Sequence, residues 1–425
     1  MTTTTQDVVG GGTPGPVEHE PAGATLRSAF NDYIAKVRGG DVGALPAVLG
    51  FVVLVILFTA LRPDTFATRL NWANLLNQSA AIIFIAMGLV FVLLLGEIDL
   101  SAGFTAGVSA AVLAVLLTQQ GWAWVLALIA ALLVGTLVGL LIGLLVAGLG
   151  IPSFVVTLAF FLALQGVLLA VIGTGGTIPI RDESILRVMN SNLTPLQGWV
   201  MWLLVVGGYA AVVLLGIRRR RAAGLPAGSP LIPMLRVVVL AVLLGAVVLL
   251  FNGERSINPV LRSLRGVPSI VPIAILFVVV LTFVLSKTSF GRHVYAVGGN
   301  AEGARRAGIN VGRIKIACFM IGSTLAACGG ILLASRDNSV SPSTGGAQTL
   351  LYAVGAAVIG GTSLFGGKGR VLDAIIGGLV IAVIANGLPL ITQRAEIQFI
   401  ITGLVLLLAA VVDALSRRRA AATGR

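Results

Sequence analysis

The chain has 425 residues, of which 57% are hydrophobic and only 11% are charged, and its mean hydropathy is +1.02. This composition excludes a soluble globular protein, because most of the chain is too apolar to form a surface in water. The net charge of +13 would suggest nucleic-acid binding in a soluble domain, but cytoplasmic lysines and arginines explain it in a membrane protein, so we expect no nucleic-acid partner.

The two ends of the chain differ from its middle. Residues 1–45 contain a TTTT run, a GGG run and several prolines, which cannot bury enough apolar surface to fold alone, so we expect a disordered cytoplasmic tail. Residues 417–425 carry an RRR run and are expected to form a basic cytoplasmic tail. Residues 46–416 are expected to form the transmembrane domain.

Apolar runs of spanning length fill this middle region, and they predict an all-α polytopic membrane protein with about 12 transmembrane or re-entrant helices. Two pairs of runs are the least secure, one separated by Glu97 and Asp99 and the other by residues 366–370, because one member of each pair could be a half-helix. The expected runs are 46–62, 79–96, 100–118, 122–148, 153–173, 199–217, 231–251, 269–286, 313–335, 350–366, 370–390 and 397–415.

The positive charges indicate the orientation of these runs. If both termini are cytoplasmic, the inner segments collect nineteen lysines and arginines and the outer segments collect nine. This bias follows the positive-inside rule and favours an even number of spans with both termini in the cytoplasm.

Polar residues inside or beside the apolar runs are candidates for a translocation pathway. Asp99 in GEIDLSAG either caps a helix that starts near Ser101 or belongs to a polar surface with free backbone N–H groups. Neutral amides suit an uncharged hydroxylated solute, although hydrogen bonds between helices explain them equally well. No chain of membrane-embedded acids or histidines, which ion coupling would require, is present. The candidates are Gln78, Asp99, Ser101, Gln165 and Asn386.

Glycines at spacing four mark close helix contacts. Gly135, Gly139 and Gly143 form one smooth face on the run at 122–148, and Gly103 and Gly107 repeat the pattern on the run before it. We interpret these faces as static packing surfaces rather than sliding surfaces.

Residues 287–315 form a polar stretch between two apolar runs, with six cations and one acid, Glu302. Residues 301–307 have a helix-forming composition, Asn300 can cap the start of a helix, and Gly308 can end it in a left-handed conformation. The sequence therefore predicts a short basic helix on the cytoplasmic surface that is able to contact a soluble partner.

The motifs GEIDLSAG, IPSFVVTLA, GGNAEGARRAGINVGRIK, SPSTGG and IGGTSLFGGKG follow one another between residues 71 and 413. Together they closely resemble the membrane subunits of monosaccharide ABC importers, the ribose, galactose and xylose permease family. Glu97 and Ala102 depart from the family pattern, which usually has a small residue and Val at these positions. The additional pair of spans around residues 218–221, the LRGVPSIVP stretch and the overall length most resemble the D-xylose branch.

The resemblance implies several partners. The loop at 287–315 would dock onto a cytoplasmic ATPase subunit that binds ATP and Mg²⁺, a sugar-binding protein would deliver the solute from outside, and two permeases would form a homodimer in the lipid of a prokaryotic cytoplasmic membrane. We expect no catalytic residue, cofactor or metal site in this chain, and Lys368 is not followed by the Ser or Thr of a phosphate loop. The expected contacts with the ATPase are Gly299, Asn300, Glu302, Arg305, Arg306 and Gly308.

Three other classes of protein are alternatives. A branched-chain amino-acid permease of the same broad superfamily is the nearest alternative and would differ in the ligand of its solute receptor. An ion-coupled secondary transporter would need coupling carboxylates in the membrane. A membrane-embedded enzyme would need a nucleophile or metal constellation that the sequence does not show.

Overall fold

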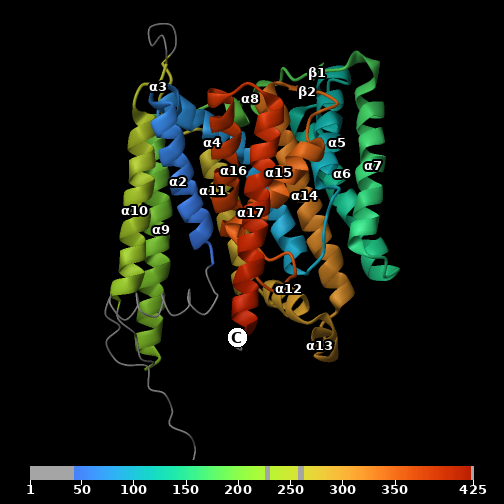
Figure 1. The fold of residues 1–425 in the computed structure, drawn as a ribbon, viewed down its shortest axis with the longest axis vertical. Coiled ribbons are helices and arrows are strands. Elements are labelled where there is room, and N and C mark those ends of the chain that lie inside the picture. The colour runs from blue at the N-terminus through green and yellow to red at the C-terminus, as the bar shows by residue number, and fades with distance from the viewer. Residues whose placement is uncertain (1–42, 225–229, 257–262, 423–425) are drawn as a thin grey trace, which may run out of the picture.

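The computed structural model describes residues 43–224, 230–256 and 263–422. The helices run side by side between two ends of the molecule (Figure 1). The short helices α12 (Ser289–Gly299) and α13 (Ala301–Arg306) lie at one end, called here the α13 end, together with the end of α17. The helix α8 (Glu183–Asn190) lies at the opposite end, called the α8 end.

Within the described residues, nine helices are long and apolar enough to cross a membrane, and three shorter apolar helices accompany them. These twelve segments confirm the predicted all-α polytopic architecture. The long helices are α4 (Arg69–Leu94), α5 with its π-helical extension η1 (Ala102–Ala114 and Val115–Gln119), α6 (Trp124–Gly148), α7 (Ser153–Ile172), α9 (Pro195–Ala222), α10 (Leu231–Asn252), α11 (Ile270–Lys287), α14 (Val311–Asp337) and α16 (Val371–Ile391). The shorter apolar segments are α2 (Leu45–Leu61), α15 (Gly346–Gly360) and the stretch Ala395–Leu408 of α17 (Ala395–Ala422).

Two helix boundaries differ clearly from the predicted runs. Helix α4 begins at Arg69 rather than near residue 79, because the side chain of Thr68 accepts a hydrogen bond from the backbone N–H of Asn71 and caps a polar first turn. Helix α15 ends at Gly360 rather than near residue 366, since Gly361 adopts a left-handed conformation with a φ of 116°.

The predicted tails fall largely beyond the described ranges. Residues 1–42 and 423–425 lie outside the described residues, so the prediction of a disordered N-terminal tail applies to a segment that the structure does not describe. Residues 417–422, which were predicted as part of the C-terminal tail, are the last turns of α17.

Two small elements complete the α8 end. The strands β1 (Ile178–Pro179) and β2 (Ser339–Val340) pair antiparallel and join the segment before α8 to the segment after α14. The remaining short helices are α3 (Pro63–Phe66) and the 3₁₀ turn η2 (Gly173–Gly175).

Helix α14 lies at the centre of the core and packs against α4, α5 and α6. Its contact with α6 is made by the glycine face of α6. A Cβ built on Gly135 would lie 2.6 Å from the Cβ of Ala327, and one built on Gly143 would lie 2.8 Å from the Cα of Ile316. Backbones therefore approach each other more closely than any larger side chain would permit.

The α6–α14 contact gives a stability prediction. A Cβ on Gly139 would lie 2.4 Å from the carbonyl oxygen of Phe319, which is backbone and cannot rotate away. Gly139→Ala should therefore destabilise the protein by about 1–3 kcal/mol, the usual cost of overpacking. Thermal unfolding in detergent micelles measures this loss.

Gly148→Ala is the matched control, because it changes the same helix at a position with no atom within 4 Å of the new Cβ. Alanine there should be neutral or slightly stabilising. Equal melting temperatures for the two variants would contradict the proposed contact.

Candidate functional site

The α13 end presents a helical hairpin made of α12 and α13. Helix α12 starts after Thr288, whose Oγ1 accepts a hydrogen bond of 3.2 Å from the backbone N–H of Gly291. Helix α13 starts after Asn300, whose Oδ1 accepts one of 2.8 Å from the N–H of Gly303. Gly308 follows α13 with a φ of 83°, so the chain reverses toward α14 in a left-handed conformation.

Helix α12 was not predicted, although the sequence contains a signal for it. Gly291, Val294 and Val297 recur every three residues after a capping threonine, and all three are buried in the structure. The polar residues around them concealed this short apolar stripe.

The exposed surface of α13 is charged. Glu302 pairs with Arg305 at 3.0 Å and with Arg306 at 3.3 Å, and their side chains are 57%, 68% and 79% exposed, respectively. Ion pairs this exposed contribute little to stability, so both guanidinium groups can exchange Glu302 for another carboxylate at small cost. The other side of α13 is fixed, since Ala304 is 5% exposed.

Three contacts join the hairpin, the end of α4 and the loop between α15 and α16. A Cβ on Gly298 would lie 1.8 Å from the carbonyl oxygen of Leu94, the last residue of α4. That same oxygen accepts a hydrogen bond of 2.9 Å from the N–H of Gly367, in the loop between α15 and α16. The Tyr295 hydroxyl donates to the carbonyl oxygen of Gly369 at 2.8 Å. The hairpin, the end of α4 and the 361–370 loop therefore form one surface.

Two further residues belong to this surface, and only Lys315 lies in the stretch 287–315 that the sequence singled out. Lys315, in the first turns of α14, forms an ion pair with Glu97, which follows α4. Phe365 is 75% exposed, and its carbonyl oxygen would lie 3.4 Å from a Cβ on Gly96. Aromatic and arginine side chains are enriched in protein contact surfaces.

Asp99 and Ser101 lie together at the start of α5. Asp99 is buried, and its Oδ1 accepts hydrogen bonds from the backbone N–H and the Oγ of Ser101 at 2.8 Å and 2.6 Å. The same loop is tied to α7, because the N–H of Ile98 donates to the Oγ of Ser153 at 3.1 Å. The Oδ1 of Asp99 therefore binds the residue that precedes α5, and its Oδ2 is buried without a hydrogen-bond partner among the described residues.

The three predicted amides lie in two separate places. The Nδ2 of Asn386 on α16 donates to the Oε1 of Gln78 on α4 at 3.2 Å, and its Oδ1 accepts from the Nδ2 of Asn71 at 2.8 Å. The chain of three amides spans two helices, and Asn71 was not singled out in the sequence. Gln165 is exposed on the outward face of α7, away from this chain.

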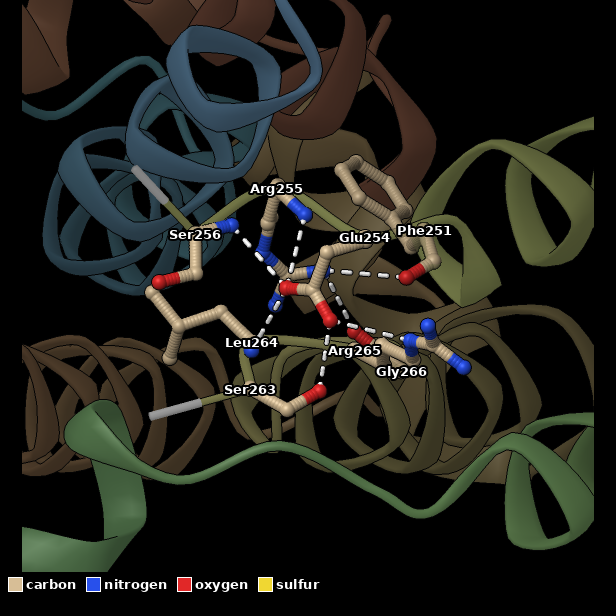
Figure 2. A network of polar contacts seen from close by, with 8 residues as sticks. All are labelled: Phe251, Glu254, Arg255, Ser256, Ser263, Leu264, Arg265 and Gly266. Carbon is tan, nitrogen blue, oxygen red and sulfur yellow. Dashed lines mark hydrogen bonds and ion pairs between the residues drawn. The ribbon is translucent and has the colours of Figure 1, made fainter. Parts of the chain in front are cut away.

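At the α8 end, Glu254 organises the loop that follows α10. Figure 2 shows its carboxylate surrounded by donors from both sides of this loop. Its Oε2 accepts from the Ser263 hydroxyl at 2.6 Å, and its Oε1 accepts from the backbone N–H groups of Ser256 and Leu264 at 3.0 Å and 2.9 Å. The Ser263 hydroxyl, these two backbone donors and Arg265 lower the pKa of Glu254 to about 2.

Arg255 anchors the same loop from the inner side (Figure 2). Only 8% of Arg255 is exposed. Its Nη1 donates to the carbonyl oxygens of Phe251 and Gly266 at 3.0 Å and 2.8 Å, and its Nη2 donates to the Oδ1 of Asn192 at 2.6 Å. The guanidinium therefore connects the loop to the segment after α8.

No group of three or more histidines, cysteines or carboxylates that could hold a metal ion occurs among the described residues. The groups described at the two ends of the molecule offer hydrogen bonds and surface charges.

Comparison with known proteins identifies the family. Residues 71–410 match the family model described as "Branched-chain amino acid transport system / permease component". The chain belongs to this permease family. The matched residues contain α12 and α13, as well as all the transmembrane helices between α4 and α16.

Individual relatives align over most of their lengths. The chain is 34% identical to the xylose transport system permease protein XylH of Escherichia coli (strain K12) over 374 residues, which cover 88% of this chain and 92% of that protein. It is 32% identical to the ribose import permease protein RbsC of Bacillus subtilis (strain 168), with coverage of 88% and 94%. No solved structure matches the chain significantly.

The cap of α13 is directly testable. Asn300→Ala removes the acceptor for the N–H of Gly303 and should cost about 1 kcal/mol of local helix stability. The amides of residues 301–306 should then exchange their hydrogens roughly five times faster. Hydrogen exchange read by mass spectrometry measures the rate, and Asn300→Asp, which keeps an acceptor, should exchange like the wild type.

The loop after α10 gives a pH prediction. Because the pKa of Glu254 is lowered from 4.5 to about 2, its contribution to loop stability is complete above about pH 4.5 and is lost only as the pH falls toward 2. Protection of the Ser256 and Leu264 amides, corrected for intrinsic exchange rates, should therefore be constant between pH 7 and pH 5. Glu254→Gln should lower that protection at both pH values, and a wild-type loss of protection within this range would refute the assignment.

Proposed function

We propose that this chain is the membrane-spanning subunit of an ATP-binding cassette importer for a monosaccharide, D-xylose or a related sugar, in the cytoplasmic membrane of a prokaryote. The observation that carries the proposal is the alignment with xylose and ribose permeases over nearly their whole length. Such an importer has a cytoplasmic ATPase and an extracytoplasmic sugar-binding protein as partners. ATP and Mg²⁺ belong to the ATPase.

The charge distribution supports a cytoplasmic α13 end. Cations gather on the hairpin, on the 361–370 loop and at the end of α9, which all lie at this end (Figure 1). The positive-inside rule then places the α8 end and the Glu254 loop outside. In this orientation the hairpin faces the ATPase and the amides at the start of α4 face the sugar-binding protein. The cations at the α13 end include Arg218, Arg219, Arg220, Arg221, Lys287, Arg292, Arg305, Arg306, Arg313, Lys315, Lys368 and Arg370.

The α12–α13 hairpin is the proposed ATPase-coupling element. Arg305 and Arg306 are exposed and only weakly held by Glu302, so they can pair with carboxylates of the ATPase. The backbone of the hairpin is fixed by Asn300 at one turn and by Gly308 at the next. Gly299, the last residue of α12, is exposed, so a partner backbone can approach it closely.

The coupling mechanism follows from the connection of α13 to α14. When the ATPases close or open around ATP, they displace the hairpin, and α14 transmits the displacement because it starts directly after α13 and crosses the whole molecule. Two permease subunits form the transporter in this proposal, and rocking of their helices opens a central path alternately to each side.

The predicted pathway residues have different roles in this proposal. Gln78 and Asn386 provide neutral hydrogen-bonding groups between α4 and α16, as required for a solute without charge. Asp99 and Ser101 bond to each other in the turn that precedes α5, and in this proposal they orient that turn. Gln165 contributes only if a second permease or the solute reaches the outward face of α7.

A branched-chain amino-acid permease is the second candidate, because the description of the matching family model names that activity. The two candidates differ in what the transporter imports. ATP-dependent accumulation of radiolabelled D-xylose or D-ribose favours the first, and accumulation of L-leucine or L-valine favours the second.

The coupling assignment predicts the effect of charge reversal. Arg305→Glu with Arg306→Glu should reduce ATP-driven sugar import at least tenfold, because carboxylates on the ATPase would meet carboxylates on α13. Membrane insertion should be unaffected, since both side chains are exposed. Import into proteoliposomes and sugar-stimulated ATP hydrolysis are the two measurements.

Arg219→Glu with Arg220→Glu is the matched control. It makes the same charge change at the same end of the molecule, on exposed residues of α9. The control should transport and hydrolyse ATP like the wild type. Equal transport by both double variants would exclude α13 as the coupling element.

A further inference from the structure

A pocket of about 510 Å³ opens at the α8 end, within the size range of small-molecule sites. It lies between the first turns of α4, helix α8, the loop after α10 and the residue that follows α14. Its polar lining consists largely of asparagines. The members are Asn74, Asn77, Asn190, Asn192 and Asn338, and we call this space the amide pocket.

The amides of the pocket suit hydroxyl groups. Each asparagine side chain carries two N–H donors and a carbonyl acceptor, so it can both give and receive hydrogen bonds, as each sugar hydroxyl also does. Asn74 and Asn77 are three residues apart on one face of α4. The Oδ1 of Asn77 is buried and has no hydrogen-bond partner among the described residues.

The charge of the pocket disfavours ions and amino acids. None of the residues that line it is acidic, so no carboxylate is available for an ammonium group. Its one cation is Arg255, and this guanidinium already donates to Asn192 and to two backbone carbonyls. The remaining lining is apolar and includes Met189 and Leu264, which suits the C–H faces of a sugar ring.

The walls of the pocket are fixed before any ligand arrives. The Nδ2 of Asn190 donates to the Oδ1 of Asn338 at 2.8 Å and to the carbonyl oxygen of Ser335 at 2.9 Å, which ties α8 to the end of α14. The Ser335 hydroxyl donates to the carbonyl oxygen of Ile185 at 2.6 Å. The Glu254 network holds the loop that carries Arg255 and Leu264 (Figure 2). Such preorganisation lowers the entropic cost of binding.

We infer that the amide pocket is the site at which the permease receives a neutral, hydroxyl-rich sugar from the extracytoplasmic side. The inference rests on the proposed function and specifies where on the permease the sugar first binds. Asn74 and Asn77 bind the hydroxyls, and Asn190 and Asn338 form the opposite wall. Because α14 begins beside α13 and ends at this wall, a displacement of the coupling hairpin reaches the pocket through α14.

Cysteine protection tests binding independently of ATP. In full-length protein with Cys318→Ala and Cys328→Ala, Ser191→Cys places a thiol in the pocket lining and leaves the amides of Asn74 and Asn77 intact. D-xylose should slow the reaction of this thiol with a maleimide several-fold, and L-valine should not. Ser184→Cys, exposed on α8 but outside the pocket lining, is the control and should react at the same rate with and without sugar.

Import by the assembled transporter, with its ATPase and sugar-binding protein, provides the second test. Asn74→Leu with Asn77→Leu should lower D-xylose import at least tenfold, because leucine keeps the side-chain size but offers no hydrogen bonds. Gln119→Leu with Gln120→Leu removes two exposed amides at the α8 end outside the pocket lining and should leave import unchanged. Wild-type import by the Asn74/Asn77 variant, or equal protection of both thiols by D-xylose, would overturn the inference.

The two proposals fail differently. If the wild-type transporter accumulates neither D-xylose nor D-ribose with ATP, the proposed function is wrong. If it accumulates D-xylose but the Asn74/Asn77 variant does so equally, only the amide pocket is wrong.

Discussion

The close backbone contact of α14 with its three neighbours is the constraint on which the structure depends. In a membrane, burying an apolar side chain between helices yields no hydrophobic free energy, because the lipid tails are equally apolar. Helices therefore associate through close packing and hydrogen bonds. Here glycines allow the backbone of α14 to lie close to its neighbours. A Cβ on Gly88 of α4 would lie 2.6 Å from the carbonyl oxygen of Gly322. A Cβ on Gly330 would lie 2.0 Å from the carbonyl oxygen of Ala106 in α5. These contacts place α14 among α4, α5 and α6 with little freedom to separate.

The position of α14 also determines how the two ends of the molecule communicate. Its 27 residues span about 40 Å, from a start capped by Asn310 to an end at Asn338. The ion pair between Lys315 and Glu97 joins its first turns to the residues after α4, and the bond from Asn190 joins the residue that follows it, Asn338, to α8. A rigid helix fastened at both ends transmits a displacement more directly than a set of loops does.

The sequence predicted the features that depend on local chemistry and missed those that depend on distant partners. Apolar length alone located twelve helices, because the bilayer requires about 20 apolar residues for each span. The missed start of α4 reflects a capped polar turn that hydropathy does not score. The strands β1 and β2 have two residues each and exist only as a pair across the fold. The amide pocket combines Asn77, Asn192 and Asn338, which come from segments far apart in the chain. One local signal for it was present, because the run NWANLLNQ at residues 71–78 contains four amides.

In the proposed function, the exposed arginines of α13 and the amides of the pocket explain how such a permease can use ATP without handling ions. Exposed cations stand at the α13 end, where a soluble partner can pair with them in water at low desolvation cost. Neutral amides stand at the α8 end and between α4 and α16, where a buried charge would be costly and a sugar needs only hydrogen bonds. In the proposed function, energy therefore enters through one end and recognition occurs at the other. Since α14 contributes to both ends, a substitution that loosens its glycine contacts should reduce the coupling of ATP hydrolysis to import. It should reduce the binding of the ATPase or of the sugar-binding protein less.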